Sequence, residues 1–128
     1  MICLLGYSKC SLKDIHVSQT ITGLTVKGKP EMNVTIANWC SCAQSNLKLD
    51  CRGFQSTKPI NPSILNVSGN VCHVNGGKPL LKAAVEFSYA WDTSFSFDPI
   101  SSSISCNWIC MQGILCLKFK FKHNVENL

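Results

Sequence analysis

The chain has 128 residues, of which 45% are hydrophobic, and a formal net charge of +5 at pH 7. This length accommodates one domain, and this hydrophobic fraction excludes a wholly disordered chain. Lysines near the C-terminus supply much of the positive charge, so the sequence lacks the dense basic patch of a nucleic-acid-binding protein, and no segment has the ~20 apolar residues of a transmembrane helix.

The N-terminus does not form a complete targeting signal. Residues 1–5 are a short apolar run that leads directly into polar sequence, without a basic region or a small-residue cleavage site. The nine cysteines nevertheless indicate an oxidising compartment. We therefore expect a secreted, extracellular protein whose signal peptide is missing from this chain, and we expect residues 1–9 to be a remnant leader or a disordered N-terminus.

Alternation of apolar and polar residues predicts strands over residues 14–19, 32–37 and 47–51, because successive side chains of a strand point to opposite faces. A turn is expected at residues 27–30, and a polar turn at residues 44–46 separates the second strand from the third. Residues 58–62 (KPINP) contain two prolines and predict an ordered loop, followed by a helical turn at residues 63–65.

The second half of the chain continues the pattern. Further strands are expected at residues 71–74, 83–91, 94–97 and 101–106, and the Asn75-Gly76 pair is a strong hairpin signal. Short strands at regular spacing are typical of an antiparallel sandwich or barrel. We predict an all-β fold, an antiparallel β-sandwich of about seven to eight short strands stapled by disulfides.

Residues 107–128 form a third region, a basic amphipathic tail that includes the strictly alternating run LCLKFKFK. One interpretation is an amphipathic strand for a membrane surface or a partner. The alternatives are an appended edge strand whose lysines prevent aggregation, or sequence read through from a non-coding region.

The cysteines have two chemical interpretations. Cys40, Cys42 and Cys51 together with a histidine would provide four zinc ligands, but the second spaced ligand pair of structural zinc sites is missing. We therefore expect disulfides and neither a metal nor another cofactor. Because nine is odd, at least one thiol stays outside any intramolecular pair.

The sequence contains no convincing catalytic group. Cys72 and His73 are neighbours on a predicted strand, so their side chains point to opposite faces and do not meet as nucleophile and base. Asp92, Asp98 and Glu86 are not distinguished from ordinary solvated acids. We predict that the protein is not an enzyme.

Two tripeptides are acceptors for N-glycosylation. Asn33 begins Asn-Val-Thr on the outward face of a predicted strand, and Asn66 begins Asn-Val-Ser in a predicted loop. We expect both asparagines to carry glycans in a secreted protein.

Several segments together resemble one family, and their order along the chain makes the likeness specific. These segments are CSLKDIHVSQTITG (10–23), NWCSC (38–42), LKLDCRGF (47–54), INP (60–62), VCHVNGGKPL (71–80), VEFSYAWD (85–92) and ISC (104–106). They resemble the plant tapetum determinant family of small secreted cysteine-rich proteins over about residues 10–106. The resemblance implies three disulfides among six cysteines, whose connectivity is open: Cys10, Cys40, Cys42, Cys51, Cys72 and Cys106.

The resemblance also implies a function. It implies a secreted, non-enzymatic signalling ligand that is recognised by the ectodomain of a leucine-rich-repeat receptor-like kinase, with a somatic-embryogenesis-type co-receptor. Its role would be cell-fate specification in the anther and tapetum. We expect the receptor to contact two loops whose proline and glycine content fixes their shape: Lys58, Asn61 and Pro62 in the first, and Asn75, Gly76, Gly77 and Lys78 in the second.

The alternative function is an extracellular carbohydrate-binding module acting on cell-wall glycans. Trp39, Trp91 and Trp108 would then stack on sugar rings. Two exposed, coplanar tryptophans on one face would favour this alternative, whereas tryptophans buried in the core would favour the receptor ligand.

Overall fold

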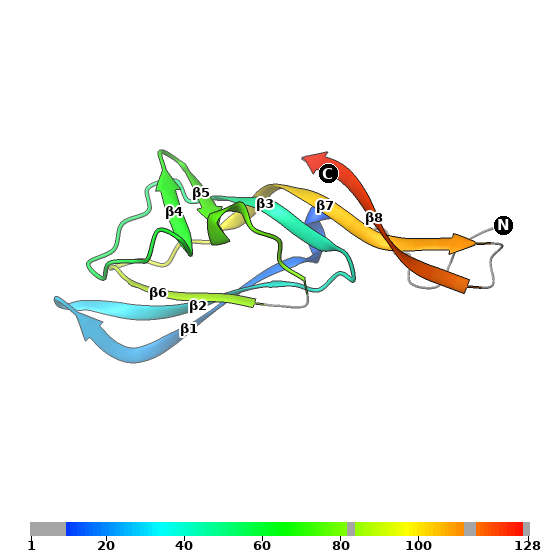
Figure 1. The fold of residues 1–128 in the computed structure, drawn as a ribbon. Helices are drawn as coiled ribbons and strands as arrows, with labels where there is room; N and C mark the ends of the chain where they lie inside the picture. The colour runs from blue at the N-terminus through cyan, green and yellow to red at the C-terminus, as the bar shows by residue number, and fades with distance from the viewer. Residues whose placement is uncertain (1–9, 82–83, 112–114, 127–128) are drawn as a thin grey trace.

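The protein is built from two antiparallel β-sheets, seen as two layers in the computed structural model (Figure 1). The structure describes residues 10–81, 84–111 and 115–126, and from residue 107 onward it describes the backbone alone. In chain order the elements are η1 (Leu12–Asp14), β1 (Ile15–Val26), β2 (Lys29–Asn38), β3 (Ala43–Asp50), β4 (Leu65–Ser68), β5 (Val71–Val74), η2 (Asn75–Gly77), β6 (Ala84–Ala90), β7 (Asp98–Met111) and β8 (Leu115–Glu126).

Sheet A has the strand order β1-β2-β6, and sheet B has the order β4-β5-β3-β7-β8. Every strand pairing within the two sheets is antiparallel. This arrangement confirms the predicted all-β sandwich. The chain enters sheet B after β2, returns to sheet A for β6 and ends in sheet B, so the two layers are interleaved along the sequence.

The core lies between the sheets and follows the alternation seen in the sequence. On β2 the side chains of Val34 and Ile36 are fully buried, while Asn33 and Thr35 point outward and are half-buried. The opposite layer contributes further buried side chains, among them Leu47, Leu49 and Val74 of sheet B. Burial of a large apolar side chain stabilises the folded state by about 1.5–3 kcal/mol, which makes this alternation decisive for strand placement.

The predicted hairpin at Asn75-Gly76 is wrong. Asn75 and Gly76 do have the positive φ angles that the dipeptide suggests, 58° and 63°, but they belong to the 3-10 helix η2. The preceding strand β5 already has β4 on one side and β3 on the other. With both edges occupied, the chain leaves sheet B, and β6 pairs with β2 in sheet A.

The predicted strand at residues 94–97 is also wrong. These residues form a loop that turns inward, with Phe97 fully buried and at φ 52°. Side chains replace a strand partner for its backbone: the Phe95 N–H donates to the Tyr89 hydroxyl (3.1 Å), and the Phe95 carbonyl accepts from the Gln19 amide (2.5 Å). The alternation of serine and phenylalanine here reflects aromatic packing, since Phe97 lies 5.6 Å from both the Phe87 and the Tyr89 ring centroids.

Three smaller expectations need correction. The segment containing Asn66 is the edge strand β4 and not a loop, because it pairs with β5 over Leu65–Ser68. The polar turn expected at residues 44–46 is instead the beginning of β3. The turn expected at residues 63–65 lies at residues 62–64, where the Ile64 N–H donates to the Asn61 carbonyl (2.9 Å).

The backbone of the tail forms an edge strand. β8 pairs with β7 from Ser101↔Glu126 to Met111↔Leu115 and lies at the margin of sheet B. Figure 1 shows part of this ribbon extending away from the two-layered body. This matches the edge-strand interpretation of the tail at the level of the backbone, while the side chains of its alternating run lie outside the described residues.

Candidate receptor-binding surface

Three disulfides hold the sandwich together. They join Cys10 to Cys40, Cys42 to Cys106, and Cys51 to Cys72. The pairs are separated by 30, 64 and 21 residues respectively. The structure thus assigns the connectivity that the sequence left open, and Cys40 and Cys42 are bonded to different partners.

No described cysteine remains a free thiol, so the zinc alternative at Cys40, Cys42 and Cys51 loses its thiolate ligands. Cys3 lies outside the described residues, as do the side chains of Cys110 and Cys116, so the odd thiol stays a prediction.

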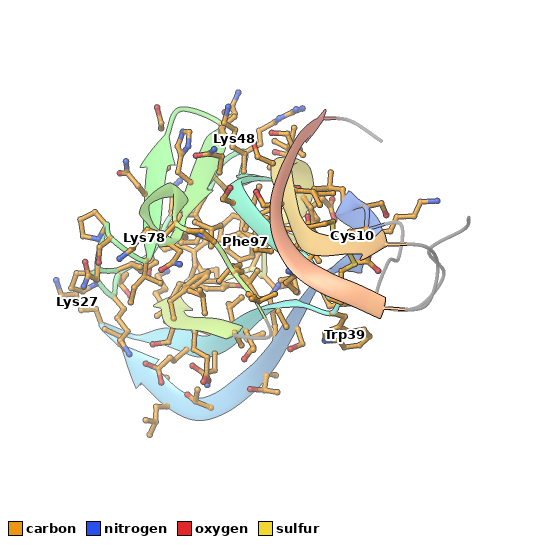
Figure 2. The ribbon with its side chains drawn as sticks, turned by 45° about the vertical axis from the view of Figure 1, so that its right-hand side comes forward. Cys10, Lys27, Trp39, Lys48, Lys78 and Phe97 are labelled. Atoms are coloured by element: carbon orange, nitrogen blue, oxygen red, sulfur yellow. A yellow bond between two sulfur atoms is a disulfide. The ribbon has the colours of Figure 1, made fainter. Side chains whose placement is uncertain are left out.

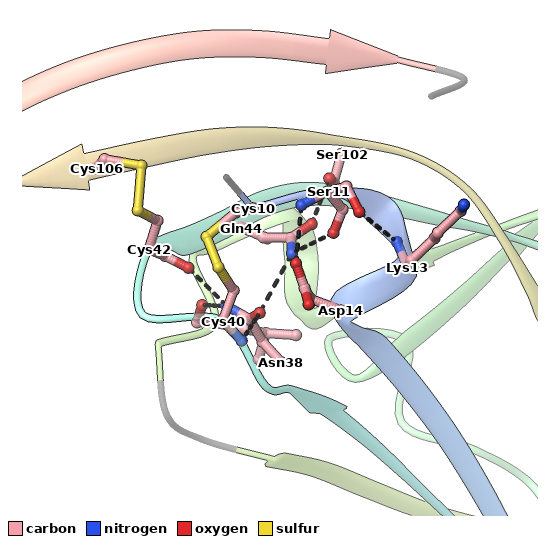
Figure 3. Close-up of a disulfide and its surroundings, with 11 residues drawn as sticks. Cys10, Ser11, Lys13, Asp14, Asn38, Cys40, Cys42, Gln44, Ser102 and Cys106 are labelled. Carbon is pink, nitrogen blue, oxygen red and sulfur yellow. Dashed lines mark hydrogen bonds between the residues drawn. A yellow bond between two sulfur atoms is a disulfide. The ribbon is translucent and has the colours of Figure 1, made fainter. Parts of the chain in front are cut away.

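Two of the disulfides lie next to each other around a buried polar network (Figure 3). Gln44 is fully buried, and its amide donates to the Ser11 carbonyl (3.0 Å) and to the Asn38 side-chain oxygen (3.2 Å). Its own oxygen accepts from the Ser102 hydroxyl (2.6 Å). The network connects the N-terminal segment, β2, β3 and β7, so it fixes how the two layers meet beside the sulfurs.

Asn38 is also part of this network, and its side chain holds the backbone of the Asn-Trp-Cys-Ser-Cys segment (38–42) by hydrogen bonds. Its amide donates to the carbonyls of Cys42 and Leu80, at 2.8 Å each, and its oxygen accepts from the Cys40 N–H (3.1 Å). A buried amide that satisfies several backbone groups fixes the loop between β2 and β3 in one conformation. The loop therefore places both cysteines toward their distant partners.

Parts of the two loops expected to bind the receptor lie next to each other in the structure. The turn at Asn61–Ile64 lies beside η2, because the Asn75 N–H donates to the Ile64 carbonyl (2.8 Å). Asn61, Pro62, Gly76 and Lys78 are exposed. We call the segments Asn61–Ile64 and Asn75–Lys78 the loop pair. Figure 2 shows Lys78 on the side of the molecule away from Cys10 and Trp39.

The shape of the loop pair is set by local hydrogen bonds and close contacts. The Asn61 side-chain oxygen accepts from the Ser63 N–H (3.0 Å) and hydroxyl (2.9 Å). Gly77 has φ 79°, and a Cβ at this position would lie 3.0 Å from the Asn46 side-chain oxygen on β3. Gly77 therefore has a structural reason to be glycine, and the backbone of the loop pair is held in one shape.

Lys58 does not belong to the loop pair. Its side chain contacts Glu31 of β2 and Ser88 of β6 in sheet A, and we call this set of contacts the clamp. Its ammonium is 2.6 Å from the carboxylate of Glu31 and also donates to the Ser88 hydroxyl. The neighbouring Thr57 hydroxyl donates to the Val26 carbonyl at the end of β1 (2.7 Å). These contacts give Lys58 a structural task, and its contact with a receptor stays a prediction.

The clamp changes the acidity of Glu31. The pKa of its carboxyl lies below the ordinary value of 4.5, mainly because it accepts the hydrogen bond from Lys58 and secondarily because it accepts one from Thr22 (2.8 Å). Burial of the Glu31 side chain acts to raise the pKa but does not outweigh these hydrogen bonds. The ionised carboxylate is therefore the form that the folded sheet stabilises.

The tryptophans do not form a sugar-binding platform within the described residues. Trp39 is 71% exposed and stacks on His16 at a centroid distance of 3.4 Å. Trp91 is half-buried against the core and lies beneath the Lys29 ammonium, 5.3 Å from its ring centroid. The Trp108 side chain lies outside the described residues. The described tryptophans, Trp39 and Trp91, are not both exposed, so they do not form the exposed coplanar pair that would favour sugar binding.

Both glycosylation acceptors are on strands with outward-facing asparagines. Asn33 lies on the central strand of sheet A, between Thr20 of β1 and Ser88 of β6. Asn66 is exposed on β4, at the edge of sheet B. Their modification stays a prediction, and neither asparagine belongs to the loop pair.

The fold and this surface define a small cystine-stapled β-sandwich that presents shaped loops. Residues 11–107 match the family model described as Tapetum determinant 1, C-terminal. The chain therefore belongs to the tapetum determinant family, a family of signalling proteins and not of enzymes. No curated protein and no solved structure matches the chain.

Family membership and three disulfides fit an extracellular protein. Among the residues that the structure describes, no helix is long and apolar enough to cross a membrane.

Proposed function

We propose that this protein is a secreted signalling ligand for the ectodomain of a leucine-rich-repeat receptor-like kinase, acting with a somatic-embryogenesis-type co-receptor. Its biological role would be cell-fate specification in the anther and tapetum. The single observation that carries the proposal is the family match over residues 11–107. The cystine framework supports it, because a ligand exposed outside the cell benefits from covalent stabilisation of a small domain.

The loop pair supports the choice of contact surface. The Asn75–Ile64 backbone hydrogen bond holds the two segments together, so the backbone that carries the exposed residues Pro62 and Lys78 loses little conformational freedom when a partner binds. The acceptor Asn33 lies on β2 of sheet A, whereas Asn66 lies on β4 two residues after Ile64, so a glycan at Asn66 would lie next to the loop pair. A stable interface would bury about 1,000 Å² or more in total, so the contact would extend onto neighbouring residues.

The test is a binding screen with the oxidised protein produced through a secretory pathway. A panel of receptor-kinase ectodomains would be immobilised and binding measured by surface plasmon resonance, with and without the co-receptor ectodomain. We expect saturable binding to at least one receptor, and we expect reduction of the disulfides to abolish it. Absence of binding across the panel, with correctly paired disulfides, would refute the ligand role.

A further inference from the structure

Two disulfides lie close enough for their sulfurs to exchange partners. The Sγ atoms of Cys10, Cys42 and Cys106 all lie within 4.8 Å of one another, although Cys10 is bonded to Cys40 and not to the other two. Figure 3 shows the two disulfides side by side, one at the N-terminal segment and one between β3 and β7. A thiolate at Cys10 would therefore be adjacent to an intact disulfide.

The accessibility of the four cysteines differs. Cys10 is half-buried at the surface, whereas Cys40, Cys42 and Cys106 are buried with exposed fractions of 7%, 1% and 5%. A reductant in solution therefore reaches the Cys10–Cys40 disulfide more readily than the Cys42–Cys106 disulfide. The exposed disulfide would open first, beside the protected one.

We propose that these two disulfides form a thiol–disulfide exchange centre, in which reduction of Cys10–Cys40 moves the remaining bond from Cys42–Cys106 to Cys10. In the first step a dithiol transfers two electrons and two protons to the Cys10–Cys40 bond, which breaks to give two thiols, and the dithiol becomes a cyclic disulfide. In the second step the Cys10 thiol loses its proton to water.

The resulting Cys10 thiolate attacks one sulfur of the Cys42–Cys106 disulfide. A bond forms between Cys10 and that sulfur, and the bond between Cys42 and Cys106 breaks. The sulfur that departs leaves as a thiolate and takes a proton from water. This attack exchanges one disulfide for another and therefore requires no further electrons.

The exchange would change what the N-terminal segment is attached to. In the oxidised protein, residue 10 is bonded to Cys40 in the loop that follows β2 of sheet A. After exchange it is bonded to Cys42 or Cys106, beside the β3–β7 pair of sheet B. The loop at residues 39–42 would keep one covalent tie or none, and this loop carries the exposed Trp39. The device thus couples the redox state to the freedom of one exposed aromatic side chain.

The third disulfide provides a control within the same molecule. Cys51 and Cys72 are buried, with exposed fractions of 2% and 0%, and neither belongs to a group of three sulfurs in mutual proximity among the described residues. Among the side chains that the structure describes, a thiol freed at Cys51 would have no neighbouring disulfide to attack. We therefore expect exchange between the Cys10–Cys40 and Cys42–Cys106 disulfides and none at the Cys51–Cys72 disulfide.

The experiment compares Cys40→Ser with Cys72→Ser in the full-length chain. Each variant is purified, its thiols are blocked with N-ethylmaleimide at low pH, and its disulfides are mapped by peptide mass spectrometry. In Cys40→Ser we expect Cys10 bonded to Cys42 or Cys106, with the displaced thiol labelled. In Cys72→Ser we expect labelled Cys51 and both other disulfides intact.

The mapping assigns all nine cysteines, so every outcome decides the question. Labelled Cys10 beside an intact Cys42–Cys106 disulfide would overturn the proposal, as would Cys10 bonded to Cys3, Cys110 or Cys116. If Cys40→Ser fails to fold, the wild-type protein is treated with one equivalent of dithiothreitol and quenched with acid. Exchanged peptides then support the proposal, and simple loss of Cys10–Cys40 contradicts it. Neither result bears on receptor binding, so the exchange stands or falls independently of the ligand role.

Discussion

Replacement of Tyr89 by phenylalanine tests how the inward loop at residues 94–97 is held. Tyr89 is fully buried on β6, and its hydroxyl donates to the Gln19 side-chain oxygen (2.7 Å) and accepts from the Phe95 N–H (3.1 Å). Tyr89→Phe keeps the ring and removes both hydrogen bonds. Each such bond contributes about 1 kcal/mol, so we expect a loss of about 2 kcal/mol in the free energy of unfolding. For a domain of this size the loss lowers Tm by about 6 °C.

The assay is urea denaturation at equilibrium without reductant, with fluorescence and circular dichroism as probes. The matched control is Thr25→Val, which removes a hydroxyl of an exposed residue on β1 and should change stability by less than ~0.5 kcal/mol. Amide exchange at Phe95 should accelerate in Tyr89→Phe. A Tyr89→Phe protein as stable as the control would refute the idea that side-chain hydrogen bonds, in place of strand pairing, anchor this loop.

Three further predictions concern the clamp, the buried network and the glycans. The hydrogen bond from Lys58 lowers the pKa of Glu31 in the folded protein, so the ionised carboxylate stabilises the fold above pH 4.5 and this stabilisation is lost as the pH falls through the folded pKa. In Glu31→Gln the free energy of unfolding, measured by denaturation from about pH 6 to pH 3, should therefore fall less steeply with decreasing pH than in the unmodified protein. Gln44→Leu leaves buried partners of the amide unsatisfied and should cost about 2–4 kcal/mol, measured by urea denaturation; a cost below ~1 kcal/mol would contradict the network's role. Asn33→Gln and Asn66→Gln should each remove the mass of one glycan from secreted protein, and an unchanged intact mass would disprove occupancy at that asparagine.

The sequence predicted strands best where one face of a strand is buried and the other is solvated. Residues 32–37 of β2 and 84–90 of β6 follow this rule, since their alternate apolar side chains face the core. The regular spacing of the predicted strands likewise indicated the sandwich, and the cysteine content indicated disulfides. In these segments a single physical cause, burial of one face, produces both the pattern and the structure.

The alternation of apolar and polar residues gave a wrong strand prediction at residues 94–97, where it has a cause other than burial of one strand face. Phe95 and Phe97 alternate with serines because the aromatic rings pack on Phe54 and Tyr89, in a loop without a strand partner. The Asn75-Gly76 dipeptide correctly predicted positive φ angles, but it did not predict which strand β6 pairs with. That pairing depends on which sheet edges are already occupied. Pairings between distant strands are not encoded in any short window.

The candidate site was only partly accessible to sequence reasoning. The six framework cysteines could be named, but the pairing of Cys40 and Cys42 depends on the loop conformation that Asn38 and Gln44 impose. Gln44 looked like a turn residue because glutamine is usually solvated, and nothing local signals that it is buried. Lys58 was expected at the binding surface, whereas its ion pair with Glu31 depends on a contact between residues 27 positions apart.

The most direct test of the ligand role compares two charge reversals in binding to the receptor ectodomain found in the screen. Lys78 is exposed in the loop pair, and Lys13 is exposed on η1 beside Cys10. If the loop pair is the contact surface, Lys78→Glu should weaken binding by about tenfold or more, equivalent to ~1.4 kcal/mol, while Lys13→Glu binds like the unmodified protein. Equal affinity of Lys78→Glu and the unmodified protein would contradict the loop pair as the contact surface, and a screen in which the unmodified protein binds no receptor ectodomain would contradict the ligand role itself.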